Sequence, residues 1–304
     1  MFLAEPQQTP YDFNFQIMGF RVRVSPFFWL MAIVLGWSWA SAMAQVYSRD
    51  RVSPAALKVM DDPSNPMYQR VAANLKLVDS NPGQGMLLLI WVAAVFVSIL
   101  VHELGHSLAM RRYGIHSYMI LYHFGGLAVP DSAGSFMGMS RRSDPYQQIY
   151  ISAAGPGLQL ALAGAVILLA KVAGYKVAGY ALPVEIPHLS ELLHLDAGRP
   201  IASLPLLALA QFTLLPSIFW AILNLLPVYP LDGGQIAREL LTMYSPRDGM
   251  KNSLMLSIAV GGGVAVYGLA NDQMMLGMMF GMLAFSSFQI LQAISGRGGG
   301  YGPW

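Results

Sequence analysis

The stretch HELGH occupies residues 102–106, near the end of an apolar run, residues 86–110, that contains no other charged residue. A run of this length is typical of a transmembrane helix, which needs about 20 apolar residues. Side chains four residues apart share one face of a helix, so His102 and His106 project together with Glu103 beside them. This pattern is typical of a zinc site with its general base. Because ionisable side chains inside a bilayer are costly and usually functional, the stretch predicts hydrolytic chemistry within the membrane.

The composition favours an integral membrane protein. Of the 304 residues, 55% are hydrophobic and 11% are charged, whereas soluble domains carry about 25% charged residues. The net charge of +2 gives no argument for binding to nucleic acid. The chain contains no cysteine, so any zinc ion has to be held by His, Asp or Glu. The polar N-terminus does not resemble a cleavable signal peptide, and we expect the first span to act as the insertion signal.

Apolar runs long enough to span a bilayer predict an α-helical membrane protein with about six transmembrane helices. The last two runs are separated by only three residues, so they are expected to form a C-terminal helical hairpin over residues 253–294. The predicted spans are residues 26–47, 85–110, 148–170, 204–226, 253–270 and 274–294.

Arginine placement predicts the orientation of these spans. One side of the membrane collects arginines close to the span ends, including the pairs Arg111-Arg112 and Arg141-Arg142. Positive residues beside the membrane favour the cytoplasmic side. We therefore expect a multi-pass protein of the cell membrane with both termini in the cytoplasm. Residues 48–84 and 171–203 are then extracytoplasmic loops.

The first of these loops contains a predicted amphipathic helix, with Asn65 as its cap and Pro66 as its first residue. Two interpretations remain open for it: an interfacial helix that screens the route to the active site, or a solvated connector with one packed face. Its apolar face would carry Met67, Val71, Leu75 and Val78.

Two segments have the character of strands rather than helices. Residues 20–24 alternate between apolar and charged side chains before the first span. Residues 117–129 are rich in Tyr, Ile, Leu and Phe and are interrupted by Gly125-Gly126. We expect a small β-sheet against the membrane on the cytoplasmic, active-site side.

A catalytic zinc site needs three protein ligands and one open position, so a third ligand has to come from a distant segment. Residues 224–234 read NLLPVYPLDGG at the end of the fourth span and offer Asp232. Pro227 and Pro230 prevent a regular helix there, and irregular backbone at membrane depth is tolerated where it lines a polar cavity. The glycines that follow Asp232 would let the chain approach the metal closely.

The pairing of HELGH with NLLPVYPLDGG strongly resembles the site-2 proteases, the zinc intramembrane metalloproteases. The resemblance covers most of residues 20–234 and includes FGG at residues 124–126 and AGP at residues 154–156. It implies a compact six-span prokaryotic member without a PDZ or CBS-like module. Residues 1–304 would form a single polytopic membrane protease domain, with its catalytic core at about residues 20–234. The chain departs from the family at Gln159, where the resemblance leads us to expect Asn.

The resemblance also implies the role of each site residue. His102, His106 and Asp232 would bind one zinc ion per chain. Glu103 would serve as general base and later as proton donor to the leaving amine. Asn224 matches the family's Asn, whose amide would donate to the oxyanion.

An extended substrate strand would pair with the sheet edge near residues 124–126. The expected substrate is the transmembrane segment of a single-span membrane protein, with the lipid bilayer as the second partner.

Three other functions compete with this one. A membrane zinc transporter can carry a similar helix, but the remaining spans offer almost no further ligands. A prenyl-protease or heat-shock type of membrane protease would take its third ligand from a later Glu, and no residue fits better than Asp232. A catalytically silent scaffold is disfavoured because all four core residues are present. Glu103→Gln is the discriminating change, because it should retain zinc and stop peptide cleavage if the chain is a protease, whereas transport could survive.

Overall fold

The computed structural model describes residues 7–123, 125–131, 144–179, 190–191 and 194–296. Within those ranges, six helices are long and apolar enough to cross a membrane, which confirms the predicted fold class. Their ends agree with the predicted spans to within a few residues. They are α1 (Pro26–Val46), α4 (Gln84–Arg112), α5 (Pro145–Val172), α7 (Leu204–Asn224), α9 (Gly249–Ala270) and α10 (Met274–Gly296).

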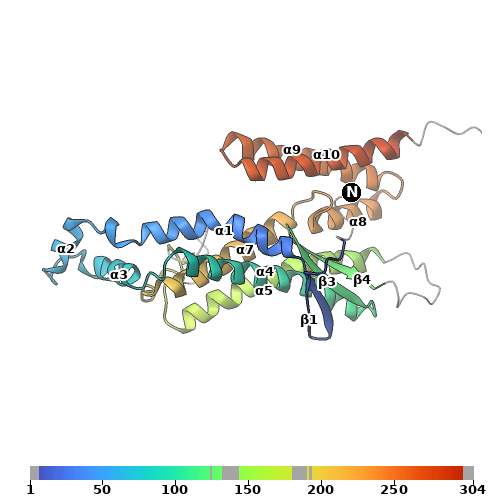
Figure 1. The fold of residues 1–304 in the computed structure, drawn as a ribbon. Coiled ribbons are helices and arrows are strands. Elements are labelled where there is room, and N and C mark those ends of the chain that lie inside the picture. The colour runs from blue at the N-terminus through green and yellow to red at the C-terminus, as the bar shows by residue number, and fades with distance from the viewer. Residues whose placement is uncertain (1–6, 124, 132–143, 180–189, 192–193, 297–304) are drawn as a thin grey trace, which may run out of the picture.

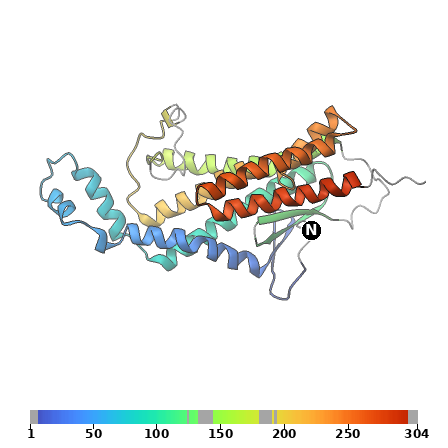
Figure 2. The ribbon, with the colours of Figure 1, turned by 90° about the horizontal axis from the view of Figure 1, so that it is seen from above.

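Helix α4 forms the centre of the bundle and packs against α1, α5 and α7. Trp91 of α4 lies over Gly36 of α1, where a side chain would collide with the indole ring. The indole nitrogen of Trp91 donates to the carbonyl oxygen of Ala32 at 3.0 Å. The α9–α10 hairpin lies beside this bundle as a separate layer (Figures 1 and 2). Because α9 packs against α8 (Asp232–Tyr244) and α8 packs against α5, α8 connects the two layers.

A four-stranded sheet covers one end of the bundle (Figure 1). Its order is β1 (Phe13–Ile17), β2 (Phe20–Val24), β3 (Ser117–Tyr122) and β4 (Gly125–Pro130). Strands β2 and β3 are parallel, and the other pairs are antiparallel. Strand β1 was not predicted, because it is a short edge strand that leaves much of its surface exposed. Strands β3 and β4 both pack against α4, so the sheet is held beside the HELGH helix turn.

The expected interruption of the second strand segment is shifted by two residues. The turn includes His123, and Gly125-Gly126 begin β4 instead of breaking it. Phe124 itself lies outside the described residues. Gly126 serves a different purpose, because β4 approaches the Glu103 side chain of α4 closely at this residue.

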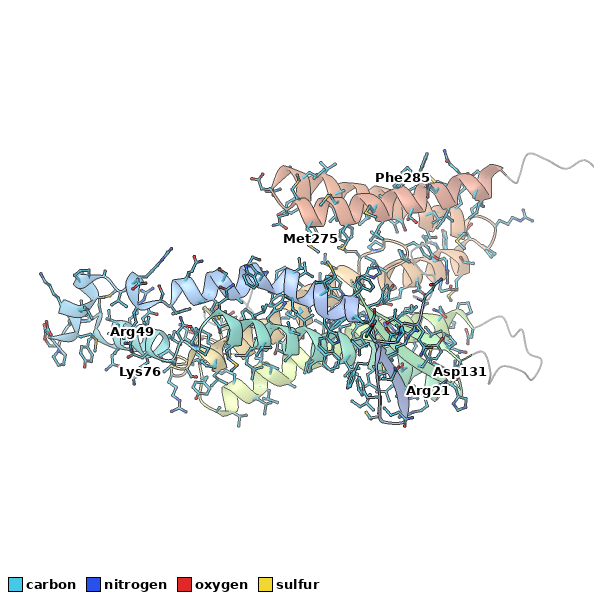
Figure 3. All side chains as sticks on the ribbon, in the orientation of Figure 1. Arg21, Arg49, Lys76, Asp131, Met275 and Phe285 are labelled. Atoms are coloured by element: carbon cyan, nitrogen blue, oxygen red, sulfur yellow. The ribbon has the colours of Figure 1, made fainter. Side chains whose placement is uncertain are left out.

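The 48–84 loop folds into η1 (Arg49–Arg51), α2 (Pro54–Met60) and α3 (Tyr68–Asp79). The predicted helix start was wrong by two residues. Asn65 accepts a hydrogen bond from Met67 N at 2.9 Å in a separate turn, and α3 begins only at Tyr68. The loop lies at the end of the bundle opposite the sheet, as Figure 3 shows by Arg49 and Lys76 at one end and Arg21 and Asp131 at the other. This position argues against the interpretation that α3 screens the active site.

The connection from α7 to α8 shows what the backbone requires of Gly233 and Gly234. A Cβ atom at Gly233 would meet the backbone of Leu225, and one at Gly234 would meet the backbone of Val228. The glycines therefore permit the chain to fold back on itself after α7. The return places Asp232 as the first residue of α8, a helix that was not predicted because the Pro-rich motif before it was read only as irregular backbone.

Candidate metal centre

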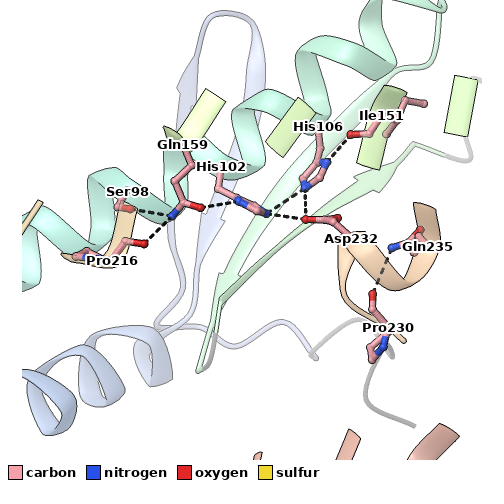
Figure 4. Close-up of polar contacts among 9 residues, drawn as sticks. All are labelled: Ser98, His102, His106, Ile151, Gln159, Pro216, Pro230, Asp232 and Gln235. Atoms are coloured by element: carbon pink, nitrogen blue, oxygen red, sulfur yellow. Dashed lines mark hydrogen bonds and ion pairs between the residues drawn. The ribbon is translucent and has the colours of Figure 1, made fainter. Parts of the chain in front are cut away.

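Three side chains from two separate elements meet beside the sheet. His102 and His106 come from α4, and Asp232 comes from the first turn of α8. The two histidine Nε2 atoms are 3.1 Å apart. Asp232 Oδ2 lies 3.2 Å from Nε2 of His102 and 3.4 Å from Nε2 of His106 (Figure 4). The structure thus brings together the three residues that the sequence suggested as metal ligands.

The spacing of these atoms fits a tetrahedral zinc ion. Zinc–nitrogen and zinc–oxygen bonds of roughly 2.0–2.1 Å place neighbouring tetrahedral ligands about 3.3 Å apart. All three residues are at least nine-tenths buried, so a bound cation would offset the cost of burying a carboxylate between two imidazoles. Two nitrogens and one oxygen also leave a fourth position open for water, as catalytic zinc sites do.

Helix α5 holds the imidazole of His106 in place. His106 Nδ1 lies 2.8 Å from the carbonyl oxygen of Ile151, which can only accept, so Nδ1 carries the proton and Nε2 is free to bind a metal. Gly155 lies directly under the same ring, where a Cβ atom would collide with it. Gly105 makes a similar close approach to the backbone of Ala154. Helices α4 and α5 therefore contact each other through glycines beside the metal-binding histidines.

Glu103 lies on the neighbouring face of α4 and is 4% exposed. Gly126 of β4 lies against its side chain, and the backbone N–H of Ala128 interacts with its carboxyl group. Tyr122, at the end of β3, is close enough for the Glu103 carboxylate to influence its pKa. Burial, together with the negative charge of Glu103, raises the pKa of Tyr122 above its ordinary value.

A cavity of about 1510 Å³ opens beside these residues. One wall is polar and carries Glu103, the three clustered side chains and Asn224. Asn224 ends α7 and is partly buried, and its side chain has no hydrogen-bond partner among the described residues. Helix α10 contributes an apolar wall to the lining, with Met275, Met278, Met279, Phe280, Met282 and Leu283.

Sequence reasoning missed the residues that support the metal ligands. Ile151 contributes a backbone carbonyl group, which leaves no mark in a single sequence. Gly155 contributes the absence of a side chain, and it was noticed only as part of the AGP motif at residues 154–156. Gln159 was noticed only as a departure from a family pattern. The structure places its amide oxygen 2.9 Å from Nδ1 of His102.

Comparison with known proteins identifies the family. The family model described as peptidase family M50 matches residues 90–267, more than half of the chain. A putative zinc metalloprotease of Synechocystis sp. is 30% identical over 155 residues, which are 50% of this chain and 31% of that protein. A zinc metalloprotease of Methanocaldococcus jannaschii is 23% identical over 201 residues, 66% of this chain and 45% of that protein. The chain therefore spans less than half of the length of either relative.

A solved structure, a site-2 protease from Methanocaldococcus jannaschii, aligns with 92% of this chain and 95% of that chain, with 18% identity and a TM-score of 0.45. The stretch matched by the family model contains HELGH as well as Asp232, the residues that meet beside the sheet. The resemblance read from these motifs is thereby confirmed, and the chain belongs to peptidase family M50, the family of the site-2 proteases.

Proposed function

We propose that this protein is a zinc-dependent intramembrane endopeptidase. One observation carries the proposal: Nε2 of His102, Nε2 of His106 and Oδ2 of Asp232 lie 3.1–3.4 Å from one another, with Glu103 beside them. The two histidines and Glu103 are on α4, a helix apolar enough to cross a membrane. Peptide hydrolysis is the reaction for which a two-His, one-carboxylate zinc site with an adjacent Glu is best suited.

The roles of the side chains follow from this geometry. His102, His106 and Asp232 would hold zinc, which supplies Lewis-acid activation of a water molecule and of the scissile carbonyl group. Glu103 accepts the proton of the attacking water and later delivers it to the nitrogen of the leaving amine. The free amide of Asn224 donates to the oxygen that becomes negative when water adds to the carbonyl carbon. Donors of this kind contribute about 3–4 kcal/mol to stabilising the transition state.

The shape of the cavity supports a membrane-embedded peptide as substrate. Its apolar wall suits the side chains of a transmembrane segment, and its polar wall places the catalytic residues beside the backbone. Strand β4 lies at the edge of the sheet, with Gly126 against Glu103. An unwound segment of a single-span membrane protein could add to this edge as a further strand, which would expose its peptide bond to the site.

The proposed orientation places the sheet and both termini on the cytoplasmic side. Arg21 and Asp131 lie at the sheet end of the molecule, and Arg49 lies at the opposite end (Figure 3). Arg111 and Arg112 end α4 beside the sheet. The concentration of arginines at this end supports a cytoplasmic assignment, and the site would then lie near the cytoplasmic surface of the membrane.

The test is co-expression of the full chain with single-span membrane proteins, comparing wild type with Glu103→Gln. The variant should bind one zinc ion per chain and release no product, because the glutamine amide cannot accept the proton of the attacking water. Glu239→Gln is a matched control, since Glu239 pairs with Arg238 on α8 and does not line the cavity. Cleavage that persists in Glu103→Gln, or zinc uptake into vesicles by wild type and variant alike, would contradict the proposal and favour transport.

A further inference from the structure

The side chain of Gln159 connects three helices behind the metal centre. It projects from α5 and is completely buried. Its amide oxygen Oε1 lies 2.9 Å from Nδ1 of His102 on α4. Its amide nitrogen Nε2 lies 2.9 Å from Oγ of Ser98 and 3.4 Å from the carbonyl oxygen of Pro216 on α7 (Figure 4).

These contacts determine which way the amide group faces. The carbonyl oxygen of Pro216 can only accept a hydrogen bond, so it has to face the NH₂ group of Gln159. The amide oxygen is then directed at His102. An oxygen that only accepts requires a proton on Nδ1 of His102, and the neutral ring then carries its lone pair on Nε2. Nε2 is the atom that faces Asp232 and His106.

Ser98 also helps to fix the orientation of the Gln159 amide, because it accepts a hydrogen bond from the amide nitrogen. Its hydroxyl oxygen is also 2.9 Å from the hydroxyl of Ser217 on α7, so Ser98 has a second partner besides Gln159. With a partner on α4 and another on α7, the amide of Gln159 cannot rotate without losing hydrogen bonds in a buried environment. Residues that orient a metal-binding histidine in this way commonly change metal affinity about 10–100-fold when they are replaced.

The length of the Gln159 side chain is also required. The Cα position is set by helix α5, and the two ends of the amide reach α4 and α7 at ordinary hydrogen-bond distances. Removal of one methylene group would withdraw the amide by more than 1 Å. At least one of the contacts would then exceed the distance of a hydrogen bond.

We propose that Gln159 is a positioning residue that holds His102 with Nδ1 protonated and Nε2 aimed at the metal, and that it thereby sets the affinity of the site for zinc. The inference rests on the proposed function, because it assumes that His102 binds a metal ion. It adds to that function a residue on a third transmembrane helix that determines how firmly the ion is held.

The test measures metal binding instead of catalysis. Zinc affinity of the purified full-length protein in detergent is measured by competition with a chromophoric chelator, and the ligand-field spectrum is recorded after loading with Co²⁺. Gln159→Leu should bind zinc about 10–100-fold more weakly than wild type and alter the Co²⁺ spectrum. Gln159→Glu should retain wild-type affinity or exceed it, because a carboxyl group offers His102 an acceptor in either protonation state. Gln159→Asn should lie between the leucine and glutamate variants.

Ser217→Ala is the matched control. It removes a hydroxyl group from the same buried network without touching Gln159 or His102, so zinc affinity should fall much less than in Gln159→Leu. The expected order of zinc affinity is Gln159→Glu, then Gln159→Asn, then Gln159→Leu. If one of these variants does not fold, the affinities of the other two can still be compared with wild type. Equal affinities for wild type and Gln159→Asn, or a Gln159→Glu variant as weak as Gln159→Leu, would overturn the inference. A wild-type protein that binds neither metal would overturn the proposed function along with it.

Discussion

The contact between Gly155 and His106 leads to a quantitative prediction. A Cβ atom added at Gly155 would lie 2.7 Å from Cδ2 of His106, with two other ring atoms still closer. Carbon atoms that are not bonded normally remain about 3.5–4.0 Å apart. Gly155→Ala therefore forces the imidazole away from α5 by about 1 Å, unless the two helices separate by the same amount.

Either response weakens the metal centre. Metal–ligand distances tolerate deviations of about 0.2 Å, so a displacement of about 1 Å removes His106 from good coordination geometry. The carbonyl oxygen of Ile151, at 2.8 Å from Nδ1, would lose its hydrogen bond at the same time. We expect zinc affinity to fall at least 10–100-fold, which corresponds to about 1.4–2.8 kcal/mol.

The neighbouring Gly157 provides the control for this substitution. It belongs to the same helix, and a Cβ atom there would have no neighbour within 4 Å. Gly157→Ala should leave zinc affinity unchanged and raise the thermal midpoint slightly, since Ala is favoured over Gly inside a helix by about 0.5–1 kcal/mol. Zinc affinity is measured by chelator competition on detergent-purified protein, and folding by thermal melting. A folded Gly155→Ala protein with wild-type affinity would show that His106 does not depend on this contact.

Three further predictions concern the cavity. Gly126→Ala should abolish cleavage and leave zinc content intact, because the new methyl group displaces Glu103, whereas Gly125→Ala, which meets no atom within 4 Å, should cleave normally. Asn224→Ala should lower kcat about 10²–10³-fold without changing zinc affinity, and a loss confined to KM would contradict an oxyanion role. Removal of the metal with a chelator should stop cleavage, and stoichiometric zinc should restore it; restoration by Mg²⁺ alone would be inconsistent with this donor set.

Much of the fold could be predicted from the sequence because the membrane simplifies it. Each spanning helix needs a long apolar run, and the six runs are separated by polar segments. Elements outside the bilayer were harder to predict. Strand β1 is short and lies at a sheet edge, and α8 follows a Pro-rich segment that reads as irregular backbone. Hydropathy carries no information about either element, because neither is long and apolar.

The clustered side chains of the site were accessible to sequence reasoning for a different reason. HELGH and LDGG are local patterns of ionisable residues in otherwise apolar surroundings, where such residues are expensive. Gly233-Gly234 have a further role that the sequence did not reveal, however. The sequence shows that Gly233-Gly234 follow a ligand, but only the backbone reveals that the chain turns back against Leu225 and Val228.

The contact between α4 and α5 holds both metal-binding histidines of α4 in position. Ser98, His102 and His106 recur every four residues along α4, so they form one stripe on that helix. Along α5, the stripe that meets them is Ile151, Gly155 and Gln159, again four residues apart. The order is antiparallel, since Gln159 meets Ser98 and His102 whereas Ile151 and Gly155 meet His106.

This register makes one helix the support for both histidines. A displacement of α5 by one residue would bring the neighbouring Pro156 or Ala154 to the place of Gly155 and would remove both acceptors from the imidazoles. Metal binding and helix packing thus depend on the same contact. In this register α5 occupies Nδ1 of both histidines, which leaves Nε2 of His102 and Nε2 of His106 free to bind the metal ion. Zinc should accordingly raise the thermal stability of the whole α4–α5 pair, and by RT ln(1 + [Zn]/Kd) the increase should be larger in wild type than in Gly155→Ala at the same metal concentration.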